Sequence, residues 1–426
     1  MADFKQSCDY LKAASLRGSR LGLERVGKLM EYLDNPQNKL KVIHIAGTNG
    51  KGSSCAMLSS ILTAAGYRTG SFNSPALTGI TDYFRIEGAE ISEDKFAEIM
   101  TEIIPVCEDM DDKPTEFEII SAAAYLLFYR EKCDIAVIEC CMGGDTDATN
   151  TIEMPLLSVI TNVRKDHTAF LGDTLAEIAS HKAGIIKSSC PVFYGDKNCG
   201  EVFDIVKARA EMRNSPLYAR DTSDISDMKF SLDGIIFRYR GFEMHTGLAG
   251  TYQAENIANV INCIEILNNH GFDISLDNMK KGFENTKWHG RFEIISNNNP
   301  LVIFDGAHNP DGISRAAETI ERYFDKIVLL TGVMADKEYN LYNSMLGRYI
   351  DKAFTVKPDN PRALDSETLA GTFENAQPFS VLSEGVCAAY SYARDNNLPL
   401  VALGSLYMYK EFIEIIKNID RNDCHA

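Results

Sequence analysis

The sequence predicts an α/β protein with two domains, the first built on a mostly parallel sheet with a small antiparallel patch. The chain has 426 residues, enough for two or three domains at roughly 150 residues each. From Leu40 onward, short apolar runs alternate with helical patterns, which is typical of a parallel sheet covered by helices. Asp233-Gly234 lies between two alternating runs and indicates a hairpin, so we do not expect a purely parallel sheet.

The composition is that of an ordinary folded protein, with 45% hydrophobic and 24% charged residues. Lys and Arg number 43 against 60 Asp and Glu, a net charge of −17, which has the wrong sign for binding nucleic acid through its phosphates. We therefore expect no nucleic-acid partner. The N-terminus lacks an apolar signal region, and no stretch approaches the ~18 apolar residues of a membrane helix. We expect a cytoplasmic protein without a membrane partner.

The eleven cysteines are scattered, with no C-x-x-C pair. This spacing favours reduced thiols over a disulfide framework or a zinc site.

Strands and helices are expected to alternate along the first domain. Thr115 and Glu118 form a capping box that predicts the start of one helix, and Asp173-Thr174 precede another. The strands are expected over residues 41–46, 135–140, 156–162 and 191–195, and the helices over 53–66, 115–129, 175–184 and 253–269.

A polar stretch ending in proline, residues 296–300, suggests a domain boundary. We expect domains over residues 1–295 and 296–426, the second a smaller Rossmann-like α/β domain with its own sheet. The strand-helix alternation restarts with runs at residues 301–309, 327–333, 352–356, 379–382 and 399–404.

Residues 43–54 read as a strand, a glycine-rich turn and a helix. Such a turn directs backbone N–H groups at phosphate oxygens, the helix N-terminus adds positive potential, and Lys51 would neutralise the outer phosphates. The sequence differs from the P-loop consensus G-x-x-x-x-G-K-[ST] at two positions. The first glycine is displaced, and Gly52 occupies the position where a magnesium-binding hydroxyl is expected. A tight turn with a solvated lysine is the alternative, but the strand-loop-helix context favours a phosphate-binding P-loop.

Glu139 ends a buried strand, where ligands of open α/β sheets gather. Its carboxylate would either hold a magnesium ion or cap the next loop, and the residues alone do not decide. His167 follows another strand and Lys182 lies on the next helix. An isolated histidine is more often a structural hydrogen-bonding group, and a helix lysine is usually a solvated surface group.

Seven motifs occur in an order that resembles the folylpolyglutamate synthase and dihydrofolate synthase family, relatives of the Mur ligases. The resemblance runs from about Gly22 to about Tyr407. The motifs are GTNGKGS, GG-x-x-DATN, DHTAFLGDTLAEIASHKAGIIK, GTYQAENIANVI, HGRFE, FDGAHNPDG and GVMADK.

The resemblance implies an ADP-forming ligase of folate biosynthesis and one-carbon metabolism. The terminal phosphate of ATP would pass to the carboxylate of a reduced folate, and the amine of L-glutamate would attack the acyl phosphate. The same protein could couple glutamate to dihydropteroate. The alternatives are a dihydrofolate synthase only, a related ligase for another carboxylate, which the unusual Ala76, Phe84 and Asp145-Thr146 suggest, or a non-catalytic nucleotide-binding protein. We expect a monomer.

The resemblance also implies roles for particular residues, in a site in the cleft between the domains. Two magnesium ions are expected, and Lys182 matches a position where the family carries a carbamylated lysine, whose carboxylate can bind the metal. The implied catalytic residues are Lys51, Glu139, His167 and Lys182; the implied nucleotide contacts are Gly47, Thr48, Asn49, Gly50, Lys51, Gly52, Ser53, Asn256, Arg291, Asp305 and His308; the implied metal ligands are Ser53, Ser74, Glu139, His167 and Lys182.

Overall fold

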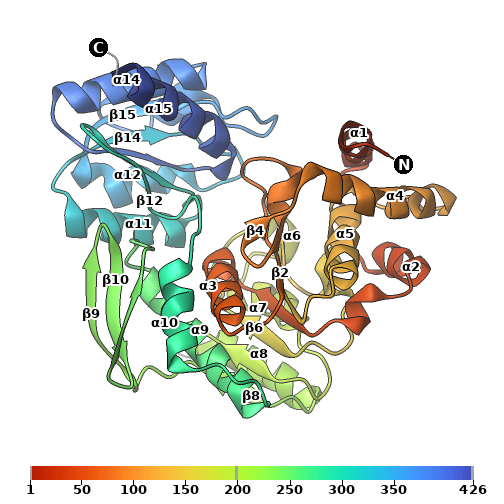
Figure 1. Ribbon diagram of the computed structural model, residues 1–426. Helices are drawn as coiled ribbons and strands as arrows, with labels where there is room; N and C mark the ends of the chain where they lie inside the picture. The colour runs from red at the N-terminus through yellow and green to blue at the C-terminus, as the bar shows by residue number, and fades with distance from the viewer. Residues whose placement is uncertain (1, 197–199, 424–426) are drawn as a thin grey trace. The chain divides into compact units, whose positions relative to one another are not determined.

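A computed structural model describes residues 2–196 and 200–423 (Figure 1). The chain divides into two compact units. Unit 1 takes in residues up to Asp227, with Phe237–His245 and Glu255–Thr286, and unit 2 takes in Met228–Ile236, Thr246–Ala254 and the chain from Lys287 onward. Among the described residues, no helix is both long and apolar enough to span a membrane.

Unit 1 is built on an eight-stranded sheet in the order β4-β3-β2-β5-β1-β6-β7-β8. The six strands β2, β5, β1, β6, β7 and β8 run parallel to one another, whereas β3 pairs antiparallel with both β2 and β4. Every residue of β1 and β5 is buried, as in parallel strands covered on both faces. The strands are β1 (Val42–Ala46), β2 (Thr69–Phe72), β3 (Phe84–Ile86), β4 (Ala89–Glu90), β5 (Ile135–Glu139), β6 (Leu157–Ile160), β7 (Val192–Tyr194) and β8 (Leu217–Ala219).

The helices of this unit begin where the sequence supplies caps. The Thr115 hydroxyl and Glu118 form the predicted capping box of α5, and Thr174 with Glu177 forms another at α7. Helix α5 packs with α1, α2 and α4 in one apolar core, and α7 and α8 share a second with β6 and β7. The helices are α1 (Phe4–Ser15), α2 (Glu24–Tyr32), α3 (Lys51–Ala64), α4 (Glu93–Asp109), α5 (Glu116–Arg130), α6 (Thr168–Leu171), α7 (Leu175–Ala183), α8 (Gly200–Met212), α9 (Gln253–Asn269) and α10 (Leu276–Asn285).

The hairpin predicted at Asp233-Gly234 is confirmed. It joins β9 (Ile225–Ser231) to β10 (Gly234–Tyr239), and β11 (Phe242–Thr246) completes a three-stranded sheet. Gly234 has a φ of 122°, and a Cβ there would lie 1.9 Å from the Thr246 carbonyl oxygen. Only glycine fits this turn.

Unit 2 carries a six-stranded sheet in the order β12-β13-β17-β14-β15-β16, parallel except for the antiparallel β12–β13 pair. Residues 298–300, within the polar stretch, connect β12 to β13. The assignment of two domains meeting at 295/296 stays a prediction. The elements are β12 (Glu293–Asn297), β13 (Leu301–Asp305), α11 (Pro310–Tyr323), β14 (Ile327–Thr331), α12 (Tyr342–Leu346), β15 (Ile350–Val356), α13 (Ser366–Ala370), β16 (Ala376–Phe379), α14 (Leu382–Asp395), β17 (Leu400–Leu403) and α15 (Tyr409–Asp423).

The strand expected near residues 379–382 is present, but its bounds are wrong by three residues. Strand β16 ends at Phe379, and α14 begins at Leu382. A short apolar run is ambiguous between strand and helix. Leu382, Val386 and Ala389 are buried and lie at helical spacing. Burial of this helix face therefore favours a helix from Leu382 onward.

Candidate functional site

The glycine-rich turn lies between β1 and α3, as predicted, and two of its glycines are required by close contacts. Gly47 has a φ of 150°, and a Cβ there would lie 1.9 Å from the Thr161 hydroxyl. Gly50 has a φ of 82°, and its Cβ would lie 2.2 Å from the Asn256 Oδ1 atom. The second contact brings Asn256, a predicted nucleotide contact on α9, beside the turn.

Residues directly after β6 hold this turn in place. The Thr48 amide donates to the Asn162 carbonyl at 3.0 Å, and the Asn49 amide donates to Asn162 Oδ1 at 3.0 Å. The Thr161 hydroxyl donates to the Asn49 carbonyl at 2.7 Å. Sequence reasoning did not identify Thr161 and Asn162 as supports of the turn, although a polar Thr-Asn pair at the end of an apolar run was a usable signal.

Two lysines from different helices meet at the Gly47 carbonyl oxygen. Lys51 Nζ donates to it at 3.1 Å and to the Thr48 carbonyl at 3.1 Å. Lys182 Nζ, from α7, donates to the same Gly47 oxygen at 2.7 Å. Lys182 is 4% exposed, and its pKa falls to about 7, first because burial disfavours the ammonium and then because Lys51 repels it. Two lysine side chains are therefore held at one carbonyl oxygen of the turn.

Glu139 ends β5 beside the P-loop strand, with Ile45 of β1 as its register partner. The carboxylate is 3% exposed. Its Oε2 atom accepts a hydrogen bond from Asn73 Nδ2 at 3.1 Å and a longer one from the Ser74 amide at 3.4 Å. Asn73 and Ser74 follow β2, the other neighbour of β5. Three strand ends thus converge here, and Asn73 is a member that sequence reasoning missed.

His167 occupies the N-cap position of α6 with a left-handed φ of 52°. Its amide donates to Asp166 Oδ1 at 2.8 Å, and its side chain is 39% exposed. Within residues 2–196 and 200–423, no group of three or more His, Cys, Asp or Glu side chains could hold a metal ion. The metal role of His167 stays a prediction.

A buried network secures the loop that follows Glu139. The Asp147 carboxylate accepts hydrogen bonds from the Met142 amide at 2.8 Å and the Thr149 hydroxyl at 2.6 Å, and burial raises the pKa of Asp147. The Thr149 oxygen in turn lies 2.9 Å from Nε2 of His44 on β1, and that nitrogen is 3.0 Å from the Cys140 sulfur. This network ties β1 to the DATN segment.

The predicted nucleotide contacts of unit 2 gather around the end of β13. Asp305 is 2% exposed, and burial raises its pKa. Its carboxylate accepts from the Tyr252 hydroxyl at 2.7 Å, the Phe292 amide at 2.9 Å and the Ala307 amide at 2.7 Å. Nearby, Arg291 Nη1 donates to the Gly290 carbonyl at 2.9 Å, and His308 Nδ1 lies 2.8 Å from the Gly306 carbonyl oxygen. The roles of Arg291, Asp305 and His308 toward a nucleotide stay predictions.

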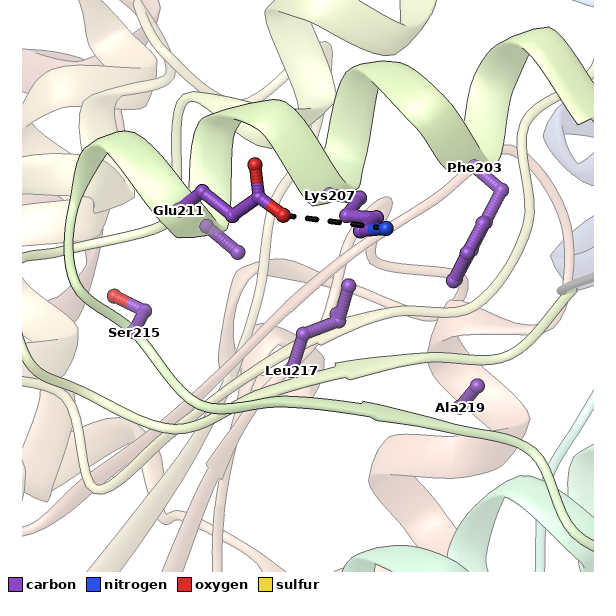
Figure 2. A pocket seen from close by; sticks show the side chains of 7 residues that line it. Phe203, Lys207, Glu211, Ser215, Leu217 and Ala219 are labelled. Carbon is purple, nitrogen blue, oxygen red and sulfur yellow. Dashed lines mark ion pairs between the residues drawn. The ribbon is translucent and has the colours of Figure 1, made fainter.

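A hollow of about 320 Å³ lies between α8 and β8. Figure 2 shows Lys207 and Glu211 of α8 over Leu217 of β8, with 4.0 Å between the Lys207 ammonium and the Glu211 carboxylate. None of the predicted site residues lines it. This hollow is not part of the candidate site.

Comparisons with known proteins identify two Mur ligase domains in this chain. The chain matches the Mur ligase middle domain over residues 45–264 and the Mur ligase glutamate ligase domain over residues 290–403. It is 32% identical to the dihydrofolate synthase/folylpolyglutamate synthase of Bacillus subtilis, over 94% of this chain and 96% of that protein. It is also 32% identical to the folylpolyglutamate synthase of Lacticaseibacillus casei, over 90% and 92%.

Solved structures show the same fold. Mycobacterium tuberculosis folylpolyglutamate synthase complexed with ADP and AMPPCP superposes with a TM-score of 0.88 at 27% identity, covering 98% of this chain and 99% of that one. Escherichia coli FolC in complex with DHPP and ADP gives 0.84 at 26% identity, covering 98% of each chain. On these matches, and on the seven motifs in order along the sequence, the chain belongs to the folylpolyglutamate synthase/dihydrofolate synthase family of Mur ligases.

Proposed function

We propose that this protein is an ATP-dependent, ADP-forming ligase that adds L-glutamate to a reduced folate through an acyl phosphate. The observation that carries the proposal is the meeting of Lys51 and Lys182 at the glycine turn, on the strand next to the buried carboxylate of Glu139. Two relatives with this fold carry ADP in their structures, which supports a nucleotide here.

The chemistry explains why such residues are needed. A carboxylate is a poor electrophile because its charge is shared by both oxygens, and phosphorylation supplies a leaving group. In phosphoryl transfer, negative charge spreads over the equatorial oxygens, so catalysis depends on positioning and on positive charge. The Thr48 and Asn49 amides already donate to Asn162. The other backbone amides of the turn, the N-terminus of the 14-residue helix α3 and the Lys51 ammonium would bind and orient the phosphates.

The residues present also fit magnesium. This ion prefers oxygen ligands, keeps several waters, and is usually held by one or two carboxylates together with substrate phosphates. Glu139 supplies a buried carboxylate, and Ser53 and Ser74 supply hydroxyl oxygens, so a larger cluster of acidic side chains is not required. Magnesium, when bound, would neutralise charge that develops on the transferring phosphate.

The environment of Lys182 supports its proposed carbamylation. With a pKa of about 7, much of the side chain is a neutral amine at physiological pH. A neutral amine can add to carbon dioxide, forming a carbamate and releasing one proton. The change replaces a cation that would repel magnesium with an anionic oxygen ligand that suits it.

Local positive charge matters because the protein has a net charge of −17 and the substrates ATP, folate and glutamate are all anions. The electrostatic field of the whole protein opposes the approach of these anions, so positive side chains at the site, such as Lys51, have to offset that repulsion.

Dihydrofolate synthase activity is the second candidate. The Bacillus subtilis relative carries both activities in its name, and the Escherichia coli relative was solved with DHPP. We therefore propose dihydropteroate as a further acceptor. The unusual Asp145, paired with His181 Nδ1 at 2.9 Å, is a local difference through which acceptor preference could change.

The test is a coupled assay of the purified protein with ATP, magnesium, L-glutamate and an acceptor. With tetrahydrofolate we expect glutamate-dependent ADP release and a folate longer by one glutamate. Dihydropteroate tests the second candidate in the same format. Absence of ADP release with every folate and pteroate acceptor would reject the proposal, and Glu139→Gln serves as the inactive control.

A further inference from the structure

The short turn that contains Arg291 has an unusual backbone. Gly290 has a φ of 69° and Phe292 a φ of 47°, so both neighbours of Arg291 lie in the left-handed region. Glycine adopts it freely, whereas a bulky residue such as phenylalanine does so only when its surroundings impose it. Phe292 is also 1% exposed. Other groups must therefore hold this turn.

Asp305 and Tyr252 hold the Phe292 side of the turn. The strained Phe292 amide donates to Asp305 Oδ2 at 2.9 Å, and the Tyr252 hydroxyl donates to the same oxygen at 2.7 Å. The segment that carries Tyr252 is itself anchored, because the Thr251 amide donates to the Thr319 hydroxyl at 3.1 Å. The carboxylate is thus fixed between a rigid hydroxyl and the strained amide.

A second carboxylate holds the Gly290 side. Glu293 Oε2 accepts from the Gly290 amide at 2.7 Å and from the Tyr409 hydroxyl at 2.9 Å. The Gly290 carbonyl accepts from the Gly306 amide at 2.8 Å. Both backbone neighbours of Arg291 are therefore fixed by a carboxylate that a tyrosine hydroxyl orients.

The guanidinium of Arg291 is confined as well. Its Nη1 atom donates to the Gly290 carbonyl at 2.9 Å, and a Cβ at Gly306 would lie 2.5 Å from that nitrogen. Arginine presents a planar set of donors that suits phosphate oxygens, and its value as a phosphate ligand depends on a fixed orientation. A strained, doubly anchored turn supplies that orientation in advance.

We propose that Tyr252 is a positioning residue, which acts through Asp305 to hold the strained Phe292 backbone and so orients Arg291 toward an anionic phosphate group. The identity of that phosphate, the nucleotide of the ligase, rests on the proposed function. Tyr252 itself does not touch the substrate in this proposal. Its hydroxyl matters only through the direction in which Arg291 points.

The matched control is Tyr323, another tyrosine of unit 2. Its ring lies 6.1 Å from the Phe292 ring. Its hydroxyl donates to the Ser231 carbonyl at 3.1 Å and to the Ala249 carbonyl at 3.4 Å, and not to Asp305. Tyr323→Phe thus removes a hydroxyl near the same core without releasing the Phe292 amide. Thermal melting of Tyr252→Phe and Tyr323→Phe shows whether each variant is folded.

Two measurements on the full chain test the proposal: the Kd for magnesium-ADP by calorimetry, and KM for ATP with kcat in the glutamate-dependent assay. Tyr252→Phe should raise both the Kd for magnesium-ADP and the KM for ATP by about tenfold, which is the effect of losing a hydrogen bond to a charged group. The kcat should stay within about twofold of the wild-type value. Tyr323→Phe should change neither. In an Arg291→Ala background, Tyr252→Phe should have no further effect, because the residue it orients is gone.

Several results would overturn the proposal. Unchanged nucleotide affinity in a folded Tyr252→Phe variant would do so. An equal loss of affinity when Tyr252→Phe is added to Arg291→Ala would also do so, as would an equal loss of affinity in Tyr323→Phe, since either indicates a general loss of packing. Failure of the proposed function looks different: the wild type would release no ADP in response to glutamate. The calorimetric comparison of the five proteins (the wild type, the three single variants and the double variant) still decides the role of Tyr252 in that case.

Discussion

Acid should destabilise this protein through His44. The side chain is fully buried in β1, and burial lowers the pKa of His44 to about 3. The Thr149 hydroxyl gives its proton to Asp147 Oδ1 at 2.6 Å, so its oxygen is left to accept from His44 Nε2 at 2.9 Å. We therefore assign the proton of the neutral ring to Nε2. The second proton would have to go to Nδ1, which has no hydrogen-bonding partner among the described residues.

The size of the effect follows from the two pKa values. The unfolded chain has the ordinary histidine value of 6.5 against about 3 in the folded protein. Because the folded pKa is lowered, the contribution of His44 to the free energy of unfolding is fully present above pH 6.5 and is lost as the pH falls toward 3. Linkage then gives a loss of about 2 kcal/mol between about pH 7 and pH 5, about 4 kcal/mol once the pH reaches the folded value, and about 5 kcal/mol below both values.

The assay is urea unfolding of the wild type and His44→Gln at these two pH values. Glutamine keeps a neutral donor for Thr149 but does not titrate. The wild type should lose about 2 kcal/mol more than the variant over this interval. His270→Gln, at the exposed end of α9, is the control and should behave as the wild type. Equal losses in wild type and His44→Gln would refute the assignment of a buried neutral histidine.

Three further predictions concern the glycine turn and its neighbours. Gly50→Ala should weaken nucleotide affinity measured by calorimetry about tenfold or more, because the new methyl group meets Asn256 at a φ that costs about 1–2 kcal/mol; Gly66→Ala, with a φ of 89° but open space around it, should leave that affinity unchanged. Lys182→Ala should lower turnover about 100-fold and recover part of it with added acetate, and full activity without acetate would exclude the carbamate. Glu139→Gln should lower kcat about 100-fold in a steady-state ADP assay while the melting temperature changes little, whereas normal turnover would remove Glu139 from the site.

Local signals in the sequence were sufficient for much of the fold. The capping box at Thr115 and the hairpin at Asp233-Gly234 were predictable because the residues that decide them are neighbours in sequence. The glycine turn was placed correctly for the same reason. The strand expected at residues 379–382 was placed three residues too late, because such a short run contains no period long enough to separate the end of a strand from the start of a helix.

The partners of the supporting residues could not be predicted, since each partner lies far along the chain, even where a polar pair at a strand end marked the position. Asn162 holds the glycine turn from the end of β6, and Asn73 reaches Glu139 from the end of β2. The left-handed Phe292 carries no sequence signal, because its backbone is imposed by Asp305 rather than by the residue itself. The fold brings these pairs together, and sequence spacing does not reveal them.

The central claim is that the protein activates a carboxylate by phosphorylating it, and isotope transfer tests this most directly. A folate whose acceptor carboxylate carries heavy oxygen is incubated with ATP, magnesium, L-glutamate and the purified protein, and the released phosphate is examined by mass spectrometry. We predict that one labelled oxygen appears in the phosphate for each amide formed, and that the transfer is lost in Glu139→Gln. Amide formation with unlabelled phosphate would contradict the acyl phosphate route.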